Sequence, residues 1–112
     1  MSPSNIFLDH ILHSIELMEY YTRDKTKEDF LNSDFIQDAV IRRLKIIGEA
    51  VRRLPSDFKD KYPEIPWENI ANVGNSLENE EYDLDLIWAT IENGVPVLKR
   101  EILRMNEVKI TY

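Results

Sequence analysis

Apolar residues recur at intervals of three and four along almost the whole chain, the spacing that gives a helix one buried face. Glycine occurs only three times, so tight β-hairpins are not expected. A chain of 112 residues has room for one domain. The sequence therefore predicts an all-α fold, an up-and-down bundle of four main helices that forms a single domain over residues 1–112.

The apolar pattern places the main helices at about residues 4–21 and 35–54, from Pro66 through Leu77, and from Asp83 or Asp85 through Ile102. Short helical turns are expected near 27–31 and 57–61. The core should span about residues 4–103. The tail, about residues 106–112, is predicted to be frayed or extended.

Three local signals mark helix boundaries or irregularities. Thr26 with Asp29 has the form of a capping box, and Asp34 with Gln37 is predicted to cap the second main helix. Pro96 interrupts the pattern of the last helix and should kink it, because proline supplies no backbone N–H.

The first helix carries two apolar faces. Its core stripe consists of Leu8, Ile11, Leu12, Ile15 and Met18. The opposite, partly apolar face holds Ile6, Leu17, Tyr20 and Tyr21, with His10 and His13 between them. A helix with a second apolar face is usually buried against something else, which is either a partner chain or another helix of the same chain.

Composition narrows the classes of function. The chain has no cysteine, which excludes disulfides, Cys-ligated metals and thiol nucleophiles. Its net charge of −7 argues against sequence-independent DNA binding but leaves room for an RNA site with locally placed cations. No signal peptide or apolar run of membrane-spanning length is present, so we expect a cytoplasmic protein that does not associate with membranes.

Two groups of side chains are candidates for chemistry. His10 and His13 could share a metal, but too few further ligands accompany them, so neither a metal nor another cofactor is expected. Four cations of the second main helix share one arc and are candidate contacts for RNA phosphate: Arg42, Lys45, Arg52 and Arg53. The alternative is that they form a solvated helix face, with Glu49 paired to Lys45 and Arg53.

The order of landmarks in the second half of the chain is more specific. Residues 43–50 read R-L-K-I-I-G-E-A, residues 62–71 read Y-P-E-I-P-W-E-N-I-A, and residues 83–88 read D-L-D-L-I-W. With the apolar start of the first helix, this order resembles the HepT-like branch of the HEPN superfamily over about residues 4–103. The resemblance implies a helical bundle that homodimerises around a cleft between the protomers.

The resemblance also implies a function. Such proteins are toxins of prokaryotic toxin–antitoxin pairs and act as metal-independent endoribonucleases on RNA. Their antitoxin is a minimal (MNT-type) nucleotidyltransferase, which can silence the toxin by transferring AMP to a tyrosine near the active site. The catalytic motif is an arginine, usually followed by asparagine, then four to six residues and a histidine, with a tyrosine two places later.

This sequence departs from that motif. Gly74 stands where the arginine is expected, before Asn75, and Asn79 or Glu80 stands where the histidine is expected. Tyr82 keeps the tyrosine and becomes the candidate AMP acceptor. Metal-free RNA cleavage needs a group that moves a proton and a cation that stabilises charge on the phosphate. We therefore predict a toxin-type protein whose motif is degenerate and whose ribonuclease activity is impaired or absent.

Two other interpretations remain open at this point. The chain could be a non-catalytic, dimeric module that docks a nucleotidyltransferase. It could also be a nuclease with a different active site, formed by His10 or His13 with Arg52.

Overall fold

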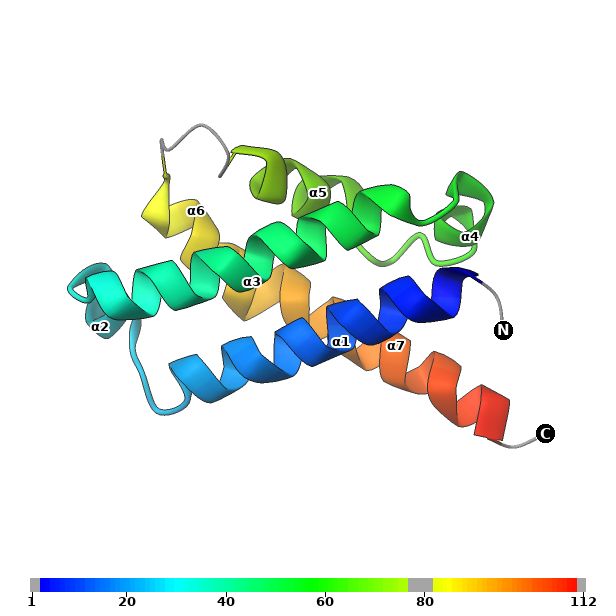
Figure 1. Cartoon of the computed structure of the whole chain (residues 1–112), viewed down its shortest axis with the longest axis horizontal. Coiled ribbons are helices and arrows are strands. Elements are labelled where there is room, and N and C mark those ends of the chain that lie inside the picture. Colours follow the sequence, from blue (N-terminus) through cyan, green and yellow to red (C-terminus); the bar gives the residue numbers. More distant parts are fainter. Residues whose placement is uncertain (1–2, 77–81, 111–112) are drawn as a thin grey trace.

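The protein is an all-α bundle, as the spacing of apolar residues predicts (Figure 1). The computed structural model describes the backbone of residues 3–76 and 82–110 and the side chains of residues 6–74 and 82–105. Within those residues there is no strand. The elements are α1 (Pro3–Thr22), α2 (Lys27–Leu31), α3 (Asp34–Arg53), α4 (Ser56–Asp60), α5 (Trp67–Ser76), α6 (Leu84–Ala89), a π-helical segment (Thr90–Gly94) and α7 (Val95–Ile110).

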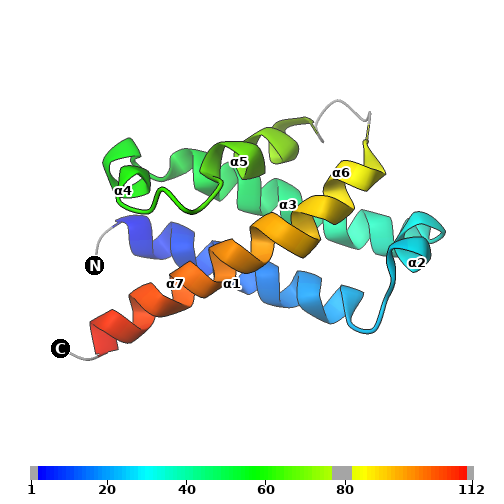
Figure 2. The same cartoon turned by 180° about the vertical axis from the view of Figure 1, so that it is seen from behind.

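Helix α3 is central to the arrangement. It packs between α1 and α5, and the continuous rod formed by α6, the π-helical segment and α7 crosses behind them (Figures 1 and 2). Each main helix turns its apolar stripe inward, because only one face of each can be removed from water. Side chains from all four main helices, together with Phe30 of α2, meet in one core and are almost fully buried: Ile11, Ile15, Leu44, Ile47, Ile70, Ile87, Leu98 and Ile102.

The boundaries of α2 and α3 are set by side chains that bind backbone groups. Thr26 and Asp29 form the predicted capping box, and the Thr26 N–H that donates to the Asp29 carboxylate holds the pKa of Asp29 below its usual value. The predicted cap of α3 is wrong by one residue, because Ser33 Oγ accepts from the N–H of Ile36. Gln37 instead donates to the carbonyl oxygens of Phe30 and Leu31 and closes the end of α2.

The irregularity expected at Pro96 takes the form of a π-helical turn. The N–H of Val95 donates to Thr90 O, five residues back, directly before the proline that cannot donate. The last helix also differs from the prediction at its end. It continues to Ile110, where a frayed or extended tail was predicted from Asn106.

The second face of α1 is not covered by another helix along its whole length. Ile6 and Tyr20 are exposed, whereas Leu17 and Tyr21 are half-buried. Of the two interpretations of this face, burial against the same chain is therefore wrong for Ile6 and Tyr20.

Among the described residues, no helix is both long enough and apolar enough to cross a bilayer.

Candidate functional site

The segment that carries the degenerate motif joins α5 to α6. Asn75 lies in the last turn of α5, but its side chain is outside the described residues, and Asn79 and Glu80 are outside them altogether. Tyr82 is described, and 40% of its surface is exposed. It directly precedes Asp83, whose Oδ1 accepts the N–H of Leu86 at 3.1 Å and caps α6. Of the two predicted starts of this helix, Asp83 and Asp85, the structure has the first.

Gly74 lies where α5 crosses α3. A Cβ atom at Gly74 would be 2.9 Å from Cα of Gly48 and 3.4 Å from the carbonyl oxygen of Leu44. A Cβ atom at Gly48 would meet Cα of Gly74 at the same 2.9 Å. The two glycines therefore allow the two backbones to touch, and this backbone arrangement has no room for an arginine at position 74.

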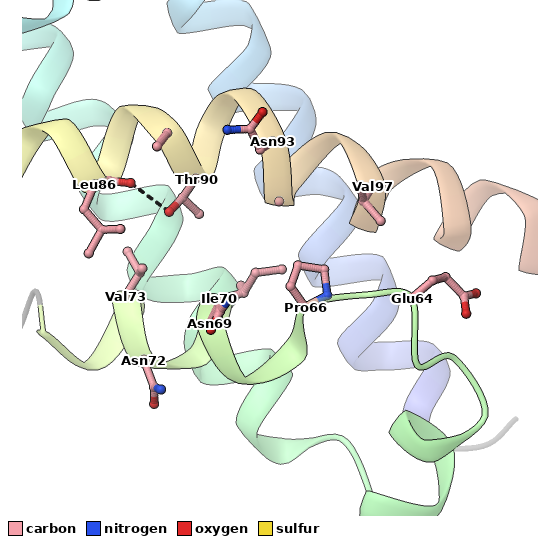
Figure 3. Close-up of a pocket in the computed structure, with 12 residues that line it drawn as sticks. Glu64, Pro66, Asn69, Ile70, Asn72, Val73, Leu86, Thr90, Asn93 and Val97 are labelled. Atoms are coloured by element: carbon pink, nitrogen blue, oxygen red, sulfur yellow. Dashed lines mark hydrogen bonds between the residues drawn. The ribbon is translucent and has the colours of Figure 1, made fainter.

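A slot of about 640 Å³ lies between α5 and the rod that follows the motif (Figure 3). Its walls are largely apolar, and Val73, Ile70 and Pro66 face Leu86, Thr90 and Val97 across it. The Thr90 hydroxyl donates to Leu86 O at 2.8 Å, within its own helix.

Polar groups stand at the margin of this slot. The side chains of Asn72 and Asn93 point away from its centre in Figure 3. Of the described residues that line it, Glu64 is the only ionisable one. The described lining of the slot therefore supplies no cation for a phosphate and no histidine to move a proton.

The four predicted RNA-contacting cations are all exposed on α3. Glu49 binds Arg52 at 3.1 Å and Arg53 at 2.9 Å. The predicted pair between Glu49 and Arg53 is therefore confirmed, while Arg52, and not Lys45, is the second partner of Glu49.

A second hollow, of about 450 Å³, lies between α1 and α3. Two of the four cations, Lys45 and Arg53, line it together with His10, whereas Arg42, Arg52 and His13 do not. Its remaining lining residues are Phe7, Ile46, Glu49 and Ala50. We call this hollow the α1–α3 groove.

The predicted site residues are thus divided between two places. Tyr82 precedes α6, whose first residues lie at the α2 end of the bundle, while Lys45 and Arg53 lie in the half of α3 that runs to the α4 end (Figure 1). Sequence analysis missed Phe7 as a lining residue of the α1–α3 groove. The sequence signal that could have identified Phe7 is its position beside the core stripe of α1.

The described residues contain no group of three or more His, Asp or Glu side chains placed to hold a metal ion. The groove combines a histidine with two cations, and the motif segment contributes the exposed hydroxyl of Tyr82.

Comparisons with known proteins identify the family. The family model "Ribonuclease HepT-like" matches residues 11–105. A protein of Methanocaldococcus jannaschii named "Gamma-glutamylcyclotransferase and putative RNase" is 50% identical over 104 residues, which are 91% of this chain and 47% of that protein. The chain therefore spans about half the length of that relative.

Other relatives match over nearly their whole length. The "Probable ribonuclease HepT" of Thermococcus cleftensis is 39% identical over 90% of this chain and 94% of its own. A protein of Caldanaerobacter subterraneus named "Putative RNase" is 34% identical over 91% of this chain and 93% of its own. No solved structure matches the chain significantly. Because the family match covers most of the chain, we conclude that the chain belongs to the HepT-like ribonuclease family.

Proposed function

We propose that this chain is the toxin-type member of a toxin–antitoxin pair, that its motif segment does not cut RNA, and that it binds an MNT-type nucleotidyltransferase. The observation that carries the loss of activity is the contact between Gly74 and Gly48. It leaves no space for an arginine where the family motif is expected to have one. No histidine follows His13 in the sequence, so the proton-moving group is missing from this segment as well.

The pairing with a nucleotidyltransferase rests on the family resemblance and on Tyr82. A modifying enzyme must reach the hydroxyl that it modifies, and the 40% exposure of Tyr82 supports such access. The position of Tyr82 immediately before the cap of α6 leaves it at the edge of the helix and not in the core.

The experiment that tests this pairing is incubation with a cognate nucleotidyltransferase, ATP and Mg²⁺, followed by mass spectrometry of proteolytic fragments. We expect one added AMP, on Tyr82. The matched control is Tyr82→Phe, which keeps the ring and removes the acceptor oxygen, and it should stay unmodified. AMP on another tyrosine, or none on the unaltered chain, would refute the assignment.

We further propose that the protein is a homodimer that buries the second face of α1. Ile6 is 50% and Tyr20 is 67% exposed, so these apolar side chains are left in water by the single chain. A two-fold arrangement would cover the same patch on both protomers.

Light scattering at micromolar concentration should therefore give about twice the 13.3 kDa of one chain. Changing both Ile6 and Tyr20 to serine should shift the protein towards the monomer, whereas Leu103→Ser, at an exposed apolar position on α7, should not. A monomer from the unaltered chain would contradict the proposal.

One observation favours the second candidate function, a non-catalytic partner-binding module. Phe35, at the start of α3, is 81% exposed, and Leu31 of the neighbouring α2 is also exposed. Large exposed apolar side chains are typical of protein interaction sites when they form one patch. Such a module would bind the nucleotidyltransferase tightly without any transfer of AMP, and this outcome separates it from the first proposal.

A further inference from the structure

We propose that His10 and His13 bind a zinc ion together with the same two histidines of a second copy of the chain. The proposal rests on the proposed function in one respect, that the chain forms a homodimer through the second face of α1. It goes beyond that function because it assigns a metal site at the dimer interface. A single chain supplies only half of the ligands of this site.

Both histidines project from the second face of α1, and both are exposed. At about 100° per residue, they lie about 60° apart around the helix axis and about 4.5 Å apart along it. Residues three positions apart are neighbours on the surface of a helix. One ion can therefore approach both imidazoles from the same side of α1.

The pair lies near the middle of the patch that the dimer is proposed to bury. Ile6 and Tyr20 are exposed at the two ends of this patch, and His13 is seven positions from each of them. A two-fold contact places the same patch on both copies, so the centre of the patch lies beside its own copy. The two-fold axis therefore passes near His13, and His10 follows within one turn of the helix.

Two copies together provide four imidazole nitrogens. This is the number that a tetrahedral zinc site requires. The sequence argues against a metal at His10 and His13 only because one chain offers too few ligands, and the described residues of one chain indeed contain no group of three. A second copy removes that objection. Imidazole nitrogen suits zinc, whereas Mg²⁺ and Ca²⁺ prefer oxygen ligands, so the ion is zinc.

Carboxylates flank His13 on its own helix. Asp9 precedes it by four positions and Glu16 follows it by three, and both are exposed. At these spacings the side chains are neighbours on the helix surface. A histidine that binds a metal usually donates its other ring N–H to a carboxylate, which orients the ring and strengthens the metal bond. Asp9 and Glu16 are placed to accept that N–H.

The cations of α3 do not place the ion in a positive field. Lys45 and Arg53 line the α1–α3 groove beside His10, and Glu49 in the same groove binds Arg53 at 2.9 Å. Lys45 is the only one of these two cations without an ion pair among the described residues. The two carboxylates of α1 outweigh this single charge, and the net charge of −7 also favours binding of a cation.

Zinc is expected to tighten the dimer. The monomer offers the ion two ligands and the dimer offers four, so zinc binds the dimer preferentially and shifts the equilibrium towards it. With free zinc at about 100 times the Kd of the dimer site, the dissociation constant of the dimer should fall by about 100-fold.

The test is sedimentation equilibrium of the full chain at pH 7.5, first in EDTA and then in zinc chloride. His10→Ala and His13→Ala should each dimerise in EDTA as the unaltered chain does and should lose the response to zinc. The matched control is Asp57→Asn with Asp60→Asn, which removes two exposed metal-binding side chains that are also three positions apart, on α4. This control should keep the full response.

Cobalt gives a spectroscopic check of the coordination. Co²⁺ in place of Zn²⁺ should produce the strong visible absorption of a tetrahedral site, with one ion per two chains. The absorption should be absent from both histidine variants. It should also disappear at pH 5.0, because a protonated imidazole cannot bind a metal.

The outcomes separate this site from the homodimer itself. A chain that is dimeric in EDTA and does not respond to zinc would refute the zinc site and leave the homodimer intact. An equal response to zinc in the histidine variants and the unaltered chain would also refute the site, since the ion would then bind elsewhere. A chain that is monomeric both in EDTA and in zinc would refute the homodimer and the site together.

Discussion

The purified chain is expected to leave RNA intact under conditions in which a family member with a complete motif cleaves it. A positioned proton-transfer group contributes about 10²–10⁴-fold to such a reaction, and a positioned charge stabiliser about 10²–10³-fold. With both missing from the motif segment, the rate should fall by at least about 10⁴-fold. The measurement is cleavage of a labelled RNA in EDTA, followed on a denaturing gel over hours.

His10→Ala and His13→Ala are the variants that locate any residual activity. His10 lines the α1–α3 groove beside two cations, whereas His13 is exposed outside it. Cleavage by the unaltered chain that disappears in His10→Ala would place the active site in the groove and contradict the proposed loss of activity. Cleavage that survives both changes would point to a contaminating nuclease.

Replacing Gly74 by alanine should lower the free energy of unfolding by about 2 kcal/mol. The added Cβ would lie 2.9 Å from Cα of Gly48, so the two helices must separate. Alanine favours the helix by about 1 kcal/mol over glycine, which offsets part of this loss. Urea unfolding followed by circular dichroism gives the value.

Gly94→Ala is the matched control. A Cβ atom there would meet Cγ of Pro66 at 3.6 Å, an ordinary contact distance, so no loss of stability is expected. Gly74→Arg should fail to fold stably, because it adds a long charged side chain to the same contact. A stable Gly74→Arg protein would show that α3 and α5 can separate and would remove the structural argument for inactivity.

The spacing of apolar residues and the helix caps, both local features of the sequence, determined the helical fold. The apolar stripes of α1, α3 and the rod and the capping box at Thr26 depend on residues within a few positions of one another, and all were predicted. The start of α6 was predicted at Asp83 or Asp85, and the structure has Asp83 as its cap. The cap of α3 was misplaced because Ser33 and Asp34 both suit that role, and the choice depended on Gln37 reaching back to α2.

Neither the packing of Gly74 nor the α1–α3 groove could be derived from the sequence. Gly74 and Gly48 lie 26 positions apart, and their contact exists only because α5 crosses α3 at those two residues. Likewise, Lys45 and Arg53 form one helical face by periodicity, but only the packing of α1 against α3 brings His10 and Phe7 to them. Helical spacing fixes which residues share a face of one helix, whereas the tertiary structure decides which face of another helix lies opposite.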